Sequence, residues 1–254
     1  MDQASFPLAP SELSQNGFHR EAAFYSCPII CPEGQAHLFE NKLHNLQLAV
    51  SRMQGLVLQP GEIFSFWGLV GRPDEKKGYK EGATFIRRKV SSATGGGLCQ
   101  LSGLLHNLAL LAGCPILERH AHSIDAYGEG RYIPLGRDAT VAYPSADLCF
   151  QNAHPFPLLL KVEIYRNRAE ARFFSQCSLP FEVIVEVSEP ILFLSPVINL
   201  EETGVREGWV EKGLDGKEVD SWRTFLFPSG ERKKEYLFHS SYQPTPTLVG
   251  RKIA

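Results

Sequence analysis

Residues 91–113 read SSATGGGLCQLSGLLHNLALLAG, and this stretch decides the fold. Three consecutive glycines, 95–97, precede leucines that recur at helical spacing, which predicts a helix from about Cys99 to Ala112. Gly113 follows, as glycine often does at the end of a helix. One face of this helix is apolar and is expected to be buried; it is formed by Leu101, Leu104, Leu105 and Leu108.

The segments around this helix predict both helix and strand. Residues 36–53 carry apolar side chains at helical spacing, and ATFIRRKV at 83–90 predicts a strand. After Pro115 the chain continues as short β segments, which read ILERHAHS, ATVAY, DLCFQN, FPLLLKVEIYR and AEARFFS. We therefore expect an α+β fold in which a central helix starting at Cys99 packs on a largely antiparallel β-sheet.

Three regions are expected along the chain. Residues 1–34 are rich in proline and polar residues and predict an irregular lead-in. Residues 35–178 are expected to form the α+β domain, and residues 179–254 a smaller β-rich region. Asp215-Gly216 and Ser229-Gly230 are typical turn signals in that last region.

Composition narrows the classes of partner. The 254 residues carry a formal net charge of −2, so no nucleic-acid partner is expected. The first residues show no basic and apolar export signal, and no run approaches the roughly 20 apolar residues of a membrane span. A cytoplasmic protein without an integral membrane segment is expected, and a cell-envelope association is left open. The oligomeric state is not indicated.

Cys99 is the candidate nucleophile. A cysteine in the first turn of a helix faces unpaired N–H groups and the positive end of the helix dipole, which favour the thiolate. The glycines before it allow a substrate to approach the backbone closely. Amides near Gly96, Gly97 and Cys99 are therefore predicted to bind an oxyanion. A buried structural thiol behind a glycine turn is the alternative.

A base and an acid are expected after the helix. The helix carries the chain roughly 20 Å away, and about six residues of a returning strand bring it back level with Cys99. His120 and His122 lie there, and their spacing does not choose between them. His106, two turns along the helix, is expected to be a packed residue. The candidate acids are Asp125, Asp138 and Asp147, of which Asp138 is favoured because it begins a β segment soon after the histidines.

No cofactor or metal is expected. The glycine run lacks the Gly-Lys-Ser/Thr of a phosphate-binding loop. Cys27 and Cys31, with His19 and His37, could hold a metal, but their spacing matches no usual zinc site.

Four stretches resemble the VanW family: PGEIFSFWGLVGRPDEKKGYKEGATFI, TGGGLCQLSGLLHNLALLAG, ERHAHSID and GRDATVAYPSADLCFQN. The resemblance covers about residues 36–165. The tail YQPTPTLVGRK is weakly similar to a small glycine-marked β module that is often appended to surface proteins of this family.

The resemblance implies a link to the bacterial cell envelope and to glycopeptide resistance. It implies a cysteine L,D-transpeptidase that acts on peptidoglycan stem peptides or their precursors, although many family members have no assigned activity. The motif cysteine falls on Cys99, the following glutamine on Gln100, and the His-Ser pair on His122 and Ser123. This favours His122 as the base and does not settle the acid.

The leading function hypothesis is cysteine-dependent acyl transfer on peptidoglycan-type peptides. The expected catalytic residues are Cys99, His122 and Asp138. Two alternatives stay open, a non-catalytic module that binds cell-wall peptide, and a peptidase or amidase of the papain or transglutaminase type. The residues expected to contact the substrate or the oxyanion are Gly96, Gly97, Gln100, Arg119, His120 and Ser123.

Overall fold

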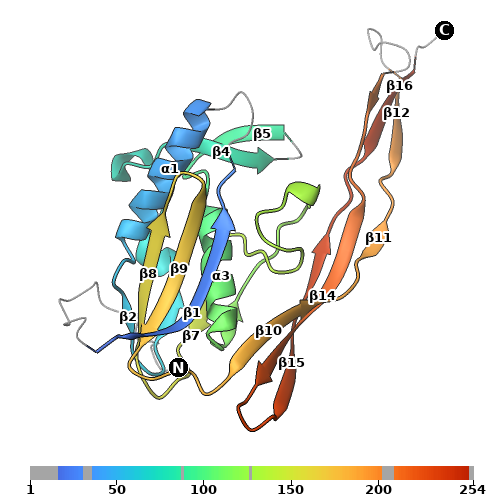
Figure 1. Ribbon diagram of the computed structural model, residues 1–254. Coiled ribbons are helices and arrows are strands. Elements are labelled where there is room, and N and C mark those ends of the chain that lie inside the picture. Colours follow the sequence, from blue (N-terminus) through green and yellow to red (C-terminus); the bar gives the residue numbers. More distant parts are fainter. Residues whose placement is uncertain (1–16, 31–35, 87–88, 126–127, 202–208, 252–254) are drawn as a thin grey trace.

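The computed structural model describes residues 17–30, 36–86, 89–125, 128–201 and 209–251. Strands outnumber helices in these residues, and most neighbouring strands run antiparallel. The predicted α+β class with largely antiparallel strands is therefore confirmed. Figure 1 shows the helices beside a sheet, and a long β-hairpin arm beyond them.

A four-stranded antiparallel sheet forms the first layer, with the strand order β1-β9-β8-β2. Alternate residues of β8 and β9, such as Leu160, Val162 and Phe173, join the main hydrophobic core. The strands are β1 (Arg20–Pro28), β2 (Val57–Leu58), β8 (Leu158–Ile164) and β9 (Arg168–Ser175).

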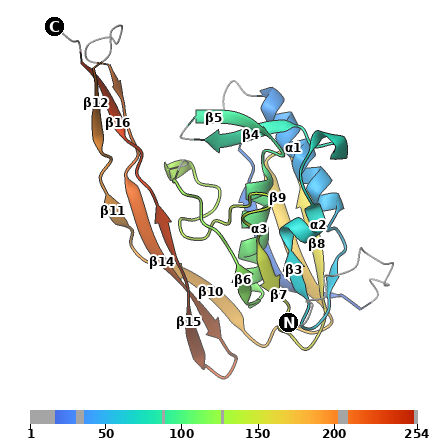
Figure 2. The ribbon, with the colours of Figure 1, turned by 180° about the vertical axis from the view of Figure 1, so that it is seen from behind.

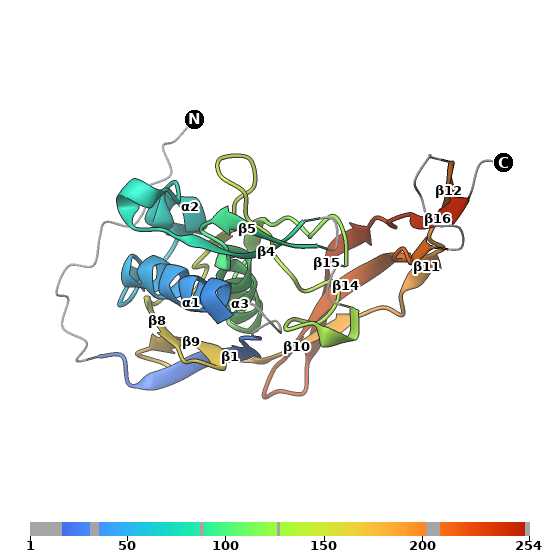
Figure 3. The same cartoon turned by 90° about the horizontal axis from the view of Figure 1, so that it is seen from above.

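Two helices form the next layer. Helix α3 (Leu98–Leu111) contacts β1 and β9, and helix α1 (Ala36–Ser51) contacts β8 and β4. Figure 3 shows both helices between the sheet and the antiparallel pair β4 (Glu81–Ile86) and β5 (Lys89–Thr94). The four leucines expected to form the apolar face of α3 are fully buried, so their removal from water stabilises this packing.

The buried polar residues of α3 hold a later part of the chain. The Ser102 hydroxyl donates to the Ala139 carbonyl at 2.6 Å, and the Asn107 side-chain amide donates to the Arg137 carbonyl at 2.9 Å. Buried polar groups need such partners, because an unsatisfied one costs about 1–3 kcal/mol. Residues 137–139 are therefore fixed to the helix that begins beside Cys99.

The glycine turn before α3 requires glycine at two positions. Gly97 caps the helix with a φ of 107°, a conformation that residues with a Cβ rarely adopt. A Cβ on Gly96 would lie 2.3 Å from the carbonyl oxygen of Gly82. The turn therefore packs against β4, backbone against backbone.

The expected irregular lead-in over 1–34 is wrong for residues 20–28, which form β1. Ala23, Tyr25 and Cys27 alternate toward the interior along this strand. Its partner, β9, lies about 140 residues later, as in the pair Cys27 and Ala169. Such long-range pairing has no local sequence signal, so the polar surroundings of the strand concealed it.

The single strand expected at 83–90 is also wrong, because this stretch spans two strands. Ile86 of β4 pairs with Lys89 of β5, so the chain reverses between them. No glycine, proline, asparagine or aspartate marks the reversal in ATFIRRKV.

A three-stranded sheet, β3-β7-β6, brings the histidine segment into place. The predicted strand ILERHAHS is regular only over β6 and continues at His120 as a single bridge with Thr140. The strands are β3 (Ile63–Ser65), β6 (Ile116–Glu118) and β7 (Cys149–Gln151), and the short helix α2 (Phe66–Val70) follows β3.

The C-terminal region is a β arm that docks on the end of α3. The buried Arg223 of β14 donates to the Leu110 and Cys114 carbonyls at 3.1 and 3.0 Å, which satisfies the end of that helix. Figure 2 shows the arm from behind. Its strands are β10 (Glu182–Val187), β11 (Ile191–Phe193), β12 (Val197–Glu201), β13 (Val210–Glu211), β14 (Gly216–Leu226), β15 (Arg232–Tyr242) and β16 (Thr247–Arg251). Among the described residues, no helix is long and apolar enough to cross a membrane.

Candidate active site

Cys99 lies in the first turn of α3 and is half-buried. The neighbouring amides have acceptors: Leu98 N–H donates to the Gly95 carbonyl at 3.3 Å, and Gln100 N–H donates to the Gly97 carbonyl at 2.9 Å. Among the hydrogen bonds formed within the described residues, none uses the N–H of Cys99. That amide is available to a substrate oxygen at the sulfur itself.

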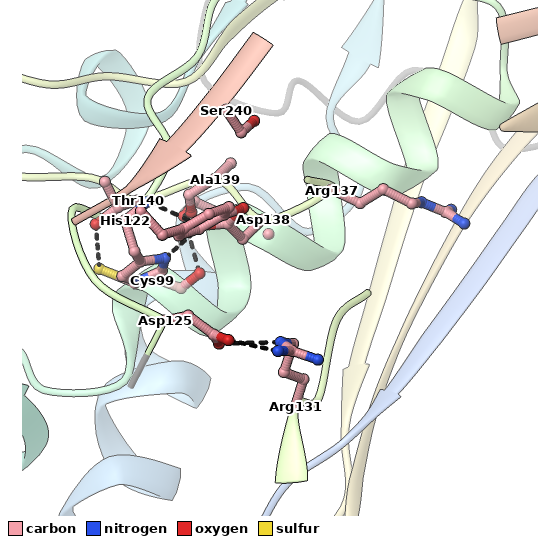
Figure 4. Close-up of polar contacts among 12 residues, drawn as sticks. Cys99, His122, Asp125, Arg131, Arg137, Asp138, Ala139, Thr140 and Ser240 are labelled. Carbon is pink, nitrogen blue, oxygen red and sulfur yellow. Dashed lines mark hydrogen bonds and ion pairs between the residues drawn. The ribbon is translucent and has the colours of Figure 1, made fainter. Parts of the chain in front are cut away.

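The Cys99 sulfur lies among polar groups. It is 3.2 Å from the Thr140 hydroxyl oxygen and 3.5 Å from the Val141 carbonyl oxygen (Figure 4). Burial raises the pKa of this thiol, but the hydrogen bond and charge of His122, helped by Thr140, outweigh burial and lower the pKa below its ordinary value. The site thus favours the nucleophilic thiolate.

His122 connects the thiol to a carboxylate. Its ring Nδ1 lies 2.7 Å from the Asp138 carboxylate oxygen Oδ2, which leaves Nε2 as the ring nitrogen that takes the thiol proton. Burial lowers the pKa of His122, whereas its contacts with Asp138 and Cys99 raise it more, to about 10. Between the lowered pKa of Cys99 and about 10, the pair is therefore thiolate and imidazolium.

Four donors hold the Asp138 carboxylate. Oδ2 accepts from the backbone N–H of His122 at 2.8 Å as well as from its ring, and Oδ1 accepts from Arg119 Nη2 at 3.0 Å and from the Tyr242 hydroxyl. Burial raises the pKa of Asp138, but His122 and Arg119 lower it far below the ordinary value. The carboxylate therefore stays ionised and fixes the orientation of the imidazole.

The other predicted contact residues divide into two groups. Arg119 supports the site from behind, since its Nε also donates to the Asp138 carbonyl at 2.7 Å. Gly96 and Gly97 shape the turn before Cys99. Ser123 is exposed, and its carbonyl accepts from the N–H of Gln243 at 2.7 Å.

Gln100 and His120 point elsewhere. The Gln100 side chain is buried and donates to the Pro28 carbonyl at 2.6 Å, so it anchors the end of β1 instead of facing a substrate. His120 Nε2 lies 2.9 Å from the Glu118 carboxylate. The structure thus brings His122, and not His120, to Cys99.

The other candidate acids have separate partners. Asp125 pairs with Arg131 and with Lys217, and Asp147 accepts from the Ser65 hydroxyl at 2.6 Å. His106 is buried, and its Nδ1 lies 3.0 Å from the Arg137 carbonyl, as expected for a packed residue.

Two residues of the site were not predicted from the sequence. Thr140 follows Asp138 by two positions in the β segment ATVAY, so strand alternation could have placed both on one side. Tyr242 is 104 residues from Asp138, and no local pattern connects them.

A cavity of about 30 Å³ lies beside His122, on the side of Asp138 and Tyr242. Apolar side chains that include Ile124, Ile133 and Leu135 also line it. An imidazole at the wall of an apolar cavity is the arrangement expected where a small substrate group binds next to a base. No cluster of potential metal ligands occurs among the described residues, and Cys31 lies outside them.

The pKa values predict selective alkylation of Cys99. In a Cys31→Ser/Cys177→Ser background, iodoacetamide at about pH 6.5 is expected to modify Cys99 at least about tenfold faster than any other cysteine. Burial raises the pKa of the remaining thiols, to about 11 at Cys27 and about 12 at Cys114 and Cys149. Peptide mapping by mass spectrometry measures each rate, and equal rates at all four cysteines would contradict the ion pair.

Comparisons with known proteins point in one direction. A family model described as VanW like protein matches residues 41–174. The chain is 39% identical over 114 residues to the vancomycin B-type resistance protein VanW of Enterococcus faecalis (strain ATCC 700802 / V583), which covers 44% of this chain and 42% of that protein. It is 35% identical over 126 residues to the uncharacterized protein YoaR of Bacillus subtilis (strain 168), which covers 50% and 40%. The chain thus spans about two fifths of the length of these relatives.

Among solved structures, the IgA1 protease G5 domain aligns with a TM-score of 0.21 and 22% identity. The alignment covers 29% of this chain and 92% of that domain.

Proposed function

This chain belongs to the family of VanW-like proteins, and from that membership together with the site we propose that it is a cysteine acyltransferase for peptidoglycan-type peptides. One observation carries the proposal, the line from the Cys99 thiol through His122 to Asp138. A nucleophile, a base and a group that orients the base form the arrangement used for acyl transfer. The link of one relative to vancomycin resistance, stated in its name, supports the choice of a cell-wall substrate.

Acylation would proceed from the ion pair. The Cys99 thiolate attacks a peptide carbonyl carbon, and the N–H of Cys99 donates to the oxyanion that forms. The His122 imidazolium then gives its proton to the leaving amine as the C–N bond breaks, which leaves a thioester on Cys99 and a neutral imidazole.

Deacylation would reverse the proton transfer. An acceptor amine attacks the thioester while His122 takes the proton of that amine, and collapse of the intermediate releases the new peptide bond and the thiolate. Water in place of the amine would give hydrolysis. Asp138 stays ionised throughout, because its pKa is held low, and stabilises the imidazolium in both steps.

The thioester tests this proposal directly. Protein incubated with a synthetic stem tetrapeptide, without acceptor, is expected to gain the mass of the donor acyl fragment, and peptide mapping should place it on Cys99. Cys149→Ala is the matched control, since Cys149 is also half-buried but has a raised pKa, and this variant should form the same adduct. An added acceptor amine should discharge the adduct. Binding of the tetrapeptide without any adduct would contradict catalysis and leave the binding-module alternative.

A further inference from the structure

One face of β15 supports the candidate site. Phe238, Ser240 and Tyr242 alternate along this strand and share a side. Phe238 lies under the Arg119 guanidinium, 4.9 Å from it, and the Ser240 hydroxyl accepts from Arg119 Nη1 at 2.8 Å. Tyr242 reaches Asp138 itself, so three successive inward residues of β15 contact the Arg119 and Asp138 pair.

The hydrogen bonds of the Tyr242 hydroxyl have a defined direction. Its oxygen accepts from the backbone N–H of Gly136 at 2.9 Å, and its own proton is therefore directed to Asp138 Oδ1. Tyr242 is 3% exposed, and burial together with the Asp138 charge raises the pKa of its hydroxyl. The hydroxyl thus remains a donor over the range in which the Cys99 and His122 pair exists.

We propose that Tyr242 is a positioning residue, whose hydroxyl holds the Asp138 carboxylate against His122, so that the C-terminal β arm completes the active site. The inference rests on the proposed function. It also goes beyond the family match, because residues 41–174 contain Cys99, His122 and Asp138 but not Tyr242. Without the hydroxyl, Oδ1 keeps Arg119 alone, and the carboxylate is free to turn toward that guanidinium and away from the imidazole.

The arm has other anchors, so this role is separable from docking. The Ser221 hydroxyl donates to the Gly136 carbonyl at 3.1 Å, Lys217 pairs with Asp125 at 2.7 Å, and Arg223 holds the end of α3. Tyr242→Phe keeps the buried ring and all of these contacts. The variant is therefore expected to fold with the arm in place.

The test compares two Tyr→Phe substitutions on the same strand. Tyr236 also donates to an aspartate, Asp220, at 3.0 Å, but it is exposed on the outer side of the arm, so Tyr236→Phe is the matched control. The pH profile of Cys99 alkylation is measured in the full chain for the wild type and both variants. The charged and titratable groups that face Asp138 are Arg119, His122, His106 of α3 and Tyr242 of β15.

Tyr242→Phe is expected to move the alkylation midpoint upward by about one pH unit, which slows modification about tenfold below the midpoint. The Nδ1–H resonance of His122 should also move in the proton NMR spectrum. Tyr236→Phe should match the wild type in both measurements.

The outcomes separate the two proposals. If the wild type is reactive at low pH and Tyr242→Phe follows the same profile, the positioning role is overturned and the acyltransferase proposal stands. A midpoint that moves downward also overturns it, because the hydroxyl would then act only by damping the Asp138 charge. A wild type without low-pH reactivity overturns both proposals.

Discussion

Cys99→Ala is expected to lower turnover of a stem-peptide donor by about 10⁴-fold or more at neutral pH, because removal of a covalent nucleophile leaves only binding and the oxyanion donors. The fold should persist, since the sulfur makes only two weak hydrogen bonds, worth about 1 kcal/mol or less each. Initial rates of product formation by liquid chromatography and mass spectrometry, with thermal unfolding alongside, measure both quantities.

Two other cysteine variants serve as controls. Cys149→Ala and Cys114→Ala are expected to keep turnover within about twofold, because burial raises the pKa of both thiols and neither contacts His122. Full turnover by Cys99→Ala would end the enzyme proposal. Equal losses in all three variants would mean that destabilisation, and not chemistry, caused the effect.

Asp138→Asn is expected to be the second most damaging change, with turnover reduced by about 10³–10⁴-fold. An amide in place of Oδ2 presents either an N–H to the imidazole N–H or a weaker acceptor, so the orientation and charge of the His122 ring are no longer fixed. The substitution also leaves the Arg119 guanidinium, whose side chain is 4% exposed, without its carboxylate. Loss of one partner of a buried pair typically costs about 3–5 kcal/mol of unfolding free energy.

The stability effect of Asp138→Asn depends on pH in a defined direction. The folded-state pKa of Asp138 lies far below its unfolded value of about 4, so its contribution is complete above about pH 4 and is lost as the pH falls through the lower value. The difference between the wild type and the variant, measured by urea unfolding, should therefore be largest at neutral pH and shrink below about pH 4.

Asp147→Asn is the matched control for Asp138→Asn. Asp147 is also well bonded, by Ser65 and by the N–H of Trp67 at 3.0 Å, so its loss should lower stability as well. The alkylation profile of Cys99 should stay unchanged in this variant. A shifted profile in Asp147→Asn, or an unshifted one in Asp138→Asn, would contradict the assignment of the orienting acid.

Much of the site could be predicted from local sequence. The leucine periodicity gave α3, and the glycine turn placed Cys99 in its first turn. Spacing alone left His120 and His122 equal, because residues two apart share a strand face. The structure separates them because regular pairing of β6 ends at Glu118, and only His122 then lies against Asp138.

The parts that sequence could not supply depend on distant contacts. Strand β1 exists because β9 pairs with it, and Gln100 is turned inward by the carbonyl of Pro28 at the end of β1. Tyr242 reaches Asp138 only because β14 and β15 dock on α3 and on Gly136. Periodicity and motif spacing describe neighbours along the chain, so contacts across 70 to 140 residues lie beyond them.

The attachment of residues 137–139 to the polar face of α3 has a mechanical consequence. The sulfur at the start of the helix and the carboxylate beside its flank ride on one rigid body, tied by Ser102 and Asn107. Substrate entry is therefore expected to leave their separation unchanged, and any opening or closing motion of the catalytic machinery must fall on the loop that bears the imidazole.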